Sequence, residues 1–150
     1  MKEYREVALT VLQKLVGCCF RYGLKAYDMD LFDLGFGDDV SFVNCLGDKQ
    51  LACRYALHFT CGIKLFWKDG CVDEYDALAD SKQFSSAVKP LIGRKVNRIA
   101  LSDKNDLWID LSLCNIVIVT YEDDIESWRF FSPGTGNSHL IASEQRMYFE

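Results

Sequence analysis

The sequence predicts an α+β fold: a predominantly antiparallel β-sheet in two similar lobes, with one N-terminal helix packed on it. Three stretches lead to this prediction. Residues 106–131 contain three strand patterns in succession, residues 51–67 alternate between apolar and polar side chains, and residues 3–16 carry an apolar stripe at helical spacing. A chain of 150 residues is expected to form a single domain, residues 1–150.

The N-terminal helix is predicted over residues 3–16. Apolar side chains recur there three or four positions apart, at Val7, Ala8, Val11, Leu12 and Leu15. Gly17 is suited to end the helix. A single apolar stripe indicates that one face of this helix packs against the sheet.

Hairpins are expected to dominate the first lobe. Strands are predicted at residues 18–24, 31–36, 51–67 and 71–73, and a further strand could start at Val40. Gly62 interrupts the longest of them, and we expect a bulge or a bend there. The Asp69-Gly70 pair then predicts a hairpin turn.

A polar segment, residues 76–87, divides the chain into two predicted lobes, residues 1–80 and 88–150. Ser81 is placed to cap a short helix that ends before Pro90. Two short motifs recur 76 residues apart: Leu15-Val16-Gly17 with Leu91-Ile92-Gly93, and Asp30-Leu31-Phe32 with Asp106-Leu107-Trp108. Two such matches indicate either an internal duplication or a chance similarity.

The second lobe is predicted to be a series of strands. They fall at residues 92–101, with a bulge, and at residues 106–111, 114–121, 126–131, 139–142 and 147–149. The acidic turn at residues 122–124 is expected to fold strand 126–131 back from strand 114–121. In total we expect about ten strands, paired mainly as sequential hairpins.

Charge and cysteine usage narrow the partners and the compartment. A net charge of −5 and a pI of about 5.0 disfavour nucleic acid, whose phosphates attract basic surfaces, and favour a basic partner protein. The N-terminus does not read as a signal peptide, and no apolar run approaches the ~20 residues that span a bilayer. Seven cysteines, an odd number set in mostly apolar runs, indicate buried, reduced thiols in a cytoplasmic protein.

Several motifs carry a resemblance to a known family. They are residues 54–65 with the later Asp76, Ile92-Gly93 with Val96, residues 106–111, residues 126–131, and residues 139–141. Together they resemble a family of small uncharacterised bacterial proteins with "YALHxxC" and "ESWRFF" motifs. Such proteins are similar to the intracellular immunity-type proteins of toxin systems, which bind and block a toxin. The resemblance therefore implies a toxin as the basic partner.

The candidate binding residues are His58, Glu126, Trp128, Arg129 and His139. An arginine beside a tryptophan can stack on a ring or hold a carboxylate in its fork. The alternative is that Trp128 or Phe131 belongs to the core and that Arg129 pairs with an acid such as Glu122 or Asp110. No catalytic residue is predicted, because His58 and Cys61 should point to opposite sides of a regular strand.

No metal site and no cofactor are predicted. Cys53, His58, Cys61 and Cys71 lack the tight paired spacing of structural zinc sites. The acidic residues Asp28, Asp30, Asp33, Asp38 and Asp39 lack the spacing of a calcium loop and are expected in solvated turns. Residues 134–137 are rich in glycine but lack the lysine of a phosphate loop, so a hairpin loop is expected.

These observations favour a non-enzymatic cytoplasmic protein-binding module, with immunity-like, toxin-neutralising binding as its specific form. The alternative is a small ligand-binding domain or enzyme that uses a cleft near His58, Arg129 and His139. Neither nucleic acid nor a membrane is expected as a partner, and the oligomeric state is left open.

Overall fold

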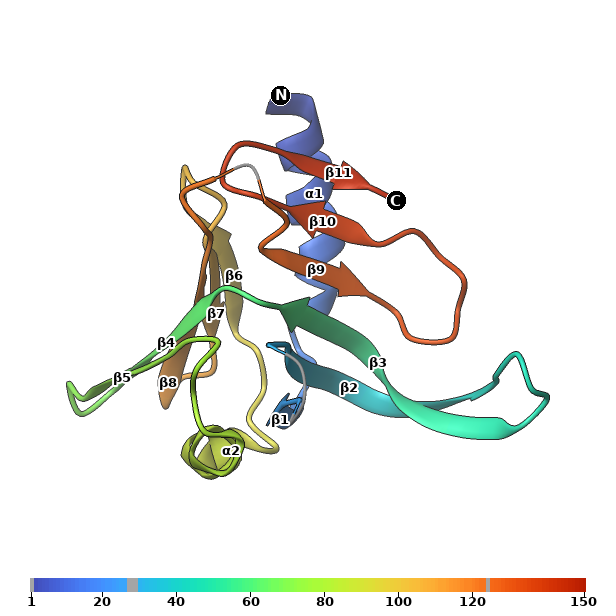
Figure 1. Ribbon diagram of the computed structural model, residues 1–150, viewed down its shortest axis with the longest axis horizontal. Coiled ribbons are helices and arrows are strands. Elements are labelled where there is room, and N and C mark those ends of the chain that lie inside the picture. Colours follow the sequence, from blue (N-terminus) through green and yellow to red (C-terminus); the bar gives the residue numbers. More distant parts are fainter. Residues whose placement is uncertain (1, 27–29, 124) are drawn as a thin grey trace.

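The computed structural model describes residues 2–26, 30–123 and 125–150 (Figure 1). Mostly antiparallel strands and two short helices make up this part of the chain, which confirms the predicted α+β class. The elements are α1 (Lys2–Leu12), β1 (Phe20–Lys25), β2 (Phe32–Val43), β3 (Lys49–Phe59), β4 (Gly62–Trp67), β5 (Val72–Tyr75), α2 (Ser81–Val88), β6 (Arg98–Leu101), β7 (Leu107–Asp110), β8 (Cys114–Val119), β9 (Trp128–Phe131), β10 (Leu140–Ala142) and β11 (Met147–Phe149).

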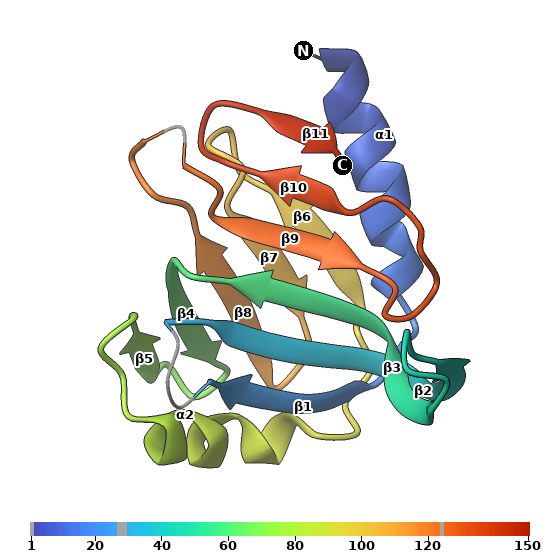
Figure 2. The same cartoon turned by 45° about the vertical axis from the view of Figure 1, so that its right-hand side comes forward.

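The strands form two sheets that enclose one hydrophobic core (Figure 2). The first sheet has the order β1-β2-β3-β9-β10-β11, and the second has the order β5-β4-β8-β7-β6. Helix α2 packs on β1, whereas α1 packs on β6 and β11 and so spans both sheets. Buried aromatic rings fill the core, including the stacked pair Phe32 and Phe59, whose ring centroids lie 4.9 Å apart.

Two connections pass from one sheet to the other, and both correct the prediction. Residues 51–67 do not form one bulged strand, because β3 ends at Phe59 in the first sheet and β4 begins at Gly62 in the second. Strand β9 likewise leaves β8 and pairs with β3. The predicted β8–β9 hairpin cannot form, since β4 and β7 already occupy both edges of β8. Meander-like pairing is therefore wrong at these two places.

Apart from β11, the two sheets repeat one strand order, an arrangement that favours duplication among the two explanations the sequence left open. In the first sheet, β1, β2 and β3 are followed by β9 and β10 from the other half of the chain. In the second sheet, β6, β7 and β8 are followed in the same way by β4 and β5. In the first sheet, Phe32 pairs across the strands with Phe59, and Phe59 pairs with Trp128. In the second sheet, Leu107 pairs with Ile118, and Ile118 pairs with Ile63, at the equivalent core positions. Each half of the chain thus contributes one hairpin to the sheet of the other half: β4 with β5, and β9 with β10.

Backbone hydrogen bonds relate the halves by an approximate two-fold axis. The N–H of Gly17 donates to the carbonyl of Val96, and the N–H of Gly93 donates to that of Phe20, both at 2.8 Å. Gly17 and Gly93 share a φ of 87°, a conformation that costs glycine little. The boundary predicted near residues 80–88 separates these two repeats along the chain, but each sheet takes strands from both sides of it.

The helices follow their apolar stripes. In α1 the side chains of Ala8 and Leu12 are fully buried, while Val7, which was also assigned to the apolar face, is 48% exposed. Helix α2 exists as predicted, but its cap is Asp80 rather than Ser81. The Asp80 carboxylate accepts a 2.9 Å hydrogen bond from the N–H of Gln83, three residues on.

The seven cysteines are free thiols in three environments. Cys53, Cys61 and Cys114 are buried, Cys18 and Cys19 are half-buried, and Cys45 and Cys71 are exposed. The expectation that the cysteines are mostly buried fails for the last two, because both lie in the tips of hairpins. Burial raises the pKa of Cys61 and of Cys114 to about 12, which suppresses their reactive thiolate forms.

Titration of the native protein with a thiol reagent should therefore separate these classes. We expect Cys45 to label quickly and Cys71 to be accessible, while Cys61 and Cys114 label only after unfolding. Mass spectrometry of the labelled peptides identifies the sites. Rapid native labelling of five or more thiols would contradict the burial described here.

Candidate functional site

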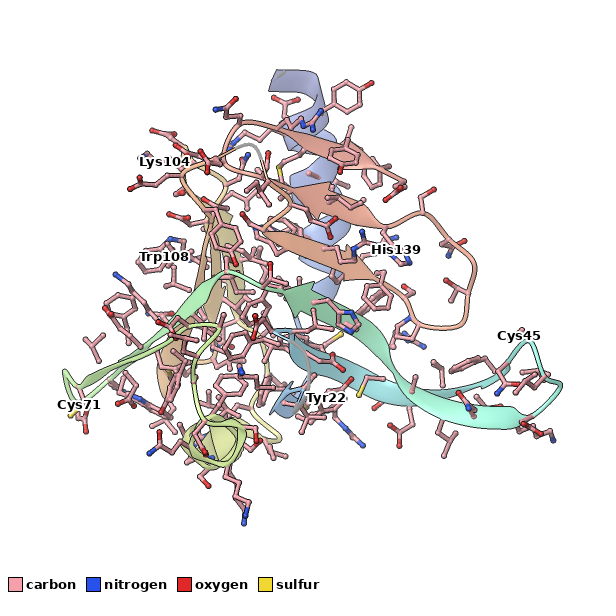
Figure 3. The ribbon with its side chains drawn as sticks, in the orientation of Figure 1. Tyr22, Cys45, Cys71, Lys104, Trp108 and His139 are labelled. Carbon is pink, nitrogen blue, oxygen red and sulfur yellow. The ribbon has the colours of Figure 1, made fainter. Side chains whose placement is uncertain are left out.

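The candidate site lies on the solvent face of the first sheet. Antiparallel pairing aligns Asp33 of β2, His58 of β3 and Arg129 of β9 in one row, although they are far apart in the sequence. Their neighbours along each strand point into the core, as strand alternation requires. Tyr22 on β1 and His139 beside β10 extend the row toward the two edges of the sheet (Figure 3).

Asp33 anchors one end of the row. Its carboxylate lies 3.3 Å from Nε2 of His58 and accepts hydrogen bonds of 3.2 Å from the hydroxyl of Tyr22. Burial, followed by the charge of Asp33, raises the pKa of the Tyr22 phenol, which therefore stays protonated as a donor. Asp33 is thus a half-buried strand residue with two partners, not part of a solvated acidic turn.

Arg129 organises the centre of the row. Its Nε and Nη2 donate to the two oxygens of Glu126 at 2.6 and 2.9 Å, and Nη2 also lies 3.7 Å from Glu150. The hydrogen bonds to Glu126 raise the pKa of Arg129, so this fork remains charged. The acid that pairs with Arg129 is therefore Glu126, and not Glu122 or Asp110.

His139 and Phe131 complete the array. Nη1 of Arg129 lies 3.0 Å from Nδ1 of His139, and because arginine only donates, Nδ1 must be the unprotonated acceptor of a neutral ring. The Phe131 ring stacks on His139 at 4.5 Å and meets His58 edge-on at 4.7 Å. One phenyl ring thus holds both imidazoles in place.

The state of His139 should make stability depend on pH. Burial, then the nearby Arg129, lowers its pKa below the ordinary 6.5. The unfolded chain consequently binds this proton more readily, so the stabilisation is present above pH 6.5 and is lost as the pH falls below it. We expect His139→Gln to flatten this dependence in thermal melts between about pH 7 and 5. Parallel curves for wild type and variant would show that His139 does not contribute.

A depression of about 460 Å³ adjoins the array. Its lining residues are Leu31, His58, Phe59, Thr60, Glu126, Ser127 and Arg129. The side chains of Glu126 and Asp33 keep 39% and 29% of their surface exposed, so both carboxylates remain accessible near it. Three of the predicted binding residues, His58, Glu126 and Arg129, therefore line one depression, and His139 contacts Arg129 beside it.

Trp128 is not part of this surface, which corrects its assignment as a binding residue. Its side chain is 0% exposed, and its indole N–H donates to the backbone carbonyl of Asn105 at 2.9 Å. Asn105 is itself buried and receives a hydrogen bond from Arg5. Trp128 is thus a core residue, as the alternative interpretation stated.

The other candidate motifs are dispersed. Cys61 is buried and its Sγ donates to the carbonyl of Ser127, on the opposite side of the chain from the outward-facing His58. Within the described residues, no three His, Cys, Asp or Glu side chains are grouped to hold a metal ion. Asp38 and Asp39 are exposed at the bulge in β2, whereas Asp28 lies outside the described residues. Residues 134–137 form the predicted hairpin loop between β9 and β10.

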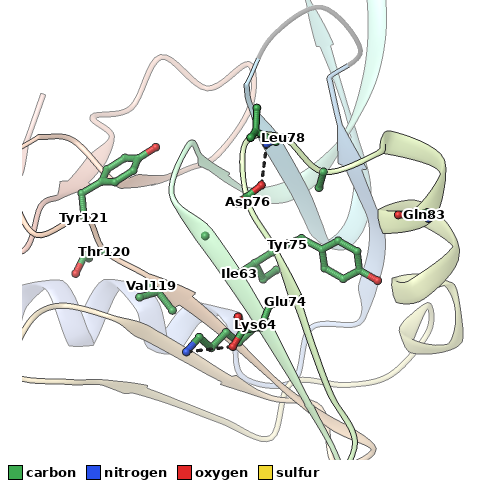
Figure 4. Close-up of a pocket in the computed structure, with 12 residues that line it drawn as sticks. Ile63, Lys64, Glu74, Tyr75, Asp76, Leu78, Gln83, Val119, Thr120 and Tyr121 are labelled. Carbon is green, nitrogen blue, oxygen red and sulfur yellow. Dashed lines mark hydrogen bonds and ion pairs between the residues drawn. The ribbon is translucent and has the colours of Figure 1, made fainter.

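A second depression, of about 500 Å³, lies at the counterpart position of the second sheet (Figure 4). The register places Lys64 where the first sheet has Arg129, and Lys64 pairs with Glu74 at 3.4 Å. Figure 4 shows the ring of Tyr75 turned toward α2. This surface offers one ion pair, compared with the connected array of the first sheet.

Sequence reasoning missed Tyr22, Asp33 and Phe131 as members of the site. Their only sequence signal is strand parity: Asp33 lies between two buried neighbours, and Phe131 follows the buried Phe130. Parity alone does not show which strands lie side by side, and β3 and β9 are neighbours only through the exchange of hairpins.

No family model, curated protein or solved structure matches this chain. The resemblance to the small bacterial proteins with immunity-type relatives therefore stays a prediction. In the described part of the chain, neither helix has the length and apolar character needed to cross a membrane.

Proposed function

We propose that the protein is a non-enzymatic, cytoplasmic protein-binding module of the immunity type, which takes a basic segment of its partner on the solvent face of the first sheet. The array that joins Asp33, His58, Phe131, His139 and Arg129 carries the proposal. Its side chains are oriented by one another before any partner arrives, which lowers the entropy lost on binding.

Charge on this face favours a basic partner. Within the array and its ion pairs, Asp33, Glu126 and Glu150 supply three carboxylates, whereas Arg129 supplies one cation that is already held by Glu126. His139 adds no charge while it is neutral. The exposed Glu122 and Asp123 extend the negative region along the loop before β9, and Asp124 lies outside the described residues.

The depression beside the array fits a long basic side chain. A lysine or arginine of the partner would lie along Leu31 and place its charge near Glu126, with the imidazole of His58 also lining the depression. Arginine and aromatic groups are common anchors of protein interfaces. An acidic protein with such an anchor site is suited to cover the basic surface of a toxin.

One observation favours the alternative of an enzyme or small-ligand domain. Asp33, which accepts a hydrogen bond from Tyr22, lies beside Nε2 of His58 in the way that a general base is oriented, and this leaves Nδ1 available. A small molecule that copurifies with the protein and is released by His58→Ala would support this alternative. A protein partner whose binding needs Glu126 would support the module.

The proposal is tested by association kinetics with the product of the adjacent gene. Neutralising the loop with Glu122→Gln and Asp123→Asn should slow association several-fold at low salt and barely change dissociation, because rim charges act mainly through steering. Asp103→Asn, an exposed turn residue of the other sheet, is the matched control. An association rate that ignores both salt and the double variant would remove the electrostatic basis of the proposal.

A further inference from the structure

The solvent face of the second sheet carries an exposed aromatic pair. Trp108 of β7 is 40% exposed, and its indole stacks on Phe66 of β4 with ring centroids 5.7 Å apart and planes inclined by 12°. Its neighbours Leu107 and Ile109 are fully buried, so Trp108 points away from the core (Figure 3). Trp108 lies opposite the buried Val117 of β8, and part of its indole plane stays open to solvent.

A small side chain opens a hollow beside this indole. Trp108 lies directly opposite Ala100 of the edge strand β6, and a hollow of about 270 Å³ borders both residues. Phe66 does not line the hollow. Phe66 therefore supports one side of the indole, and the remaining indole surface forms a wall of the hollow.

Polar side chains that line the hollow have donors and acceptors with no hydrogen-bond partner among the described residues. Arg98, Asp110 and Asn115 stand opposite one another on three adjacent strands and all line it. Asp110 accepts one backbone hydrogen bond, from Ser112. Among the residues that the structure describes, the side chains of Arg98 and Asn115 have no hydrogen-bond or ion-pair partner. Their donors and acceptors are free for a ligand.

We propose that this hollow binds a neutral carbohydrate, with one pyranose ring placed against Trp108. The apolar C–H face of a sugar ring packs on an aromatic plane, and its hydroxyls both donate and accept hydrogen bonds. Arg98 supplies donors, Asp110 acceptors, and Asn115 both. The charges of Arg98 and Asp110 cancel, so the hollow selects neither an anion nor a cation.

The three tryptophans provide an internal control for the test. The indole N–H of Trp128 is bonded to Asn105 and that of Trp67 to Asp73, whereas that of Trp108 has no partner among the described residues. Titration with neutral oligosaccharides of glucose, mannose, galactose and N-acetylglucosamine should shift the indole N–H signal of Trp108. The signals of Trp67 and Trp128 should stay in place.

Substitutions then assign the site. We expect Trp108→Ala to raise the dissociation constant for the bound sugar about tenfold or more, Arg98→Ala and Asn115→Ala to raise it less, and Trp67→Phe to leave it unchanged. Circular dichroism melts establish that each variant is folded. The proposal is overturned if none of these sugars shifts Trp108 up to about 10 mM, if binding survives Trp108→Ala, or if only charged sugars bind.

Discussion

Ile116→Asp is expected to unfold the protein at room temperature. Ile116 is fully buried in β8, between Leu65 of β4 and Ile109 of β7, with its side chain in the shared core. An unpaired carboxylate there costs several kcal/mol, against a total stability of about 5–15 kcal/mol for typical domains. Thermal and urea denaturation followed by circular dichroism measure the loss.

The control for this substitution is Asp103→Asn. Asp103 is exposed in the turn between β6 and β7, where such a change typically stays within about ±0.5 kcal/mol. Equal melting temperatures for wild type and Ile116→Asp would contradict the central place of β8 in the second sheet.

Trp128→Ala is expected to destabilise the protein by about 3–5 kcal/mol, because it leaves a large cavity in the core. It also removes the hydrogen bond that the indole donates to the carbonyl of Asn105. Asn105 is buried and has a left-handed φ of 65° in the tight turn before β7. Loss of the hydrogen bond to its carbonyl therefore also destabilises this turn.

Trp108→Ala is the matched comparison, since Trp108 lies in the other sheet and faces solvent. Its expected effect on the free energy of unfolding is small, because much of the indole is already exposed. Urea unfolding of both variants measures the contrast. A larger destabilisation by Trp108→Ala than by Trp128→Ala would reverse the assignment of core and surface.

Local pattern predicted many of the side chains that enter the core, but not which strands pair. The alternation over residues 107–111 correctly placed Leu107, Ile109 and Leu111 inside, since it depends only on strand geometry. The pairing of β3 with β9 and of β4 with β8 depends on contacts between distant residues. An acidic turn has the same sequence pattern whether the next strand pairs with the preceding one or crosses to another sheet.

The repeat was faint in the sequence for a structural reason. The halves stay 76 residues apart from Gly17 and Gly93 to the paired ends of β1 and β6. The spacing changes at the next strand, because Phe32 at the start of β2 corresponds to Leu107 at the start of β7 and not to Trp108, and the longer hairpin of β2 and β3 then shifts it further. The match of Asp30-Leu31-Phe32 with Asp106-Leu107-Trp108 is therefore one residue out of register with the structure. Side chains also differ wherever the two sheets present different surfaces. The match that stays in register, Leu15-Val16-Gly17 with Leu91-Ile92-Gly93, lies near the two-fold axis.

The sequence predicted which types of residue form the candidate site, but not how these residues are arranged in space. His58, Glu126, Arg129 and His139 were recognised from their chemistry, and the structure brings these four together. The sequence places Asp33 among the acidic turns, because its partners Tyr22 and His58 lie on other strands. Trp128 was misassigned because the aromatic strand that contains it turns one face inward.

Backbone chemical-shift mapping with the partner bound tests the proposed binding face most directly. The product of the adjacent gene is titrated into isotope-labelled protein, and the shifted amide signals are placed on the structure. The proposed function predicts that the largest shifts gather around Asp33, His58, Arg129, Phe131 and His139, and that Glu126→Gln weakens the complex. Shifts confined to the second sheet, or undiminished binding by Glu126→Gln, would contradict it.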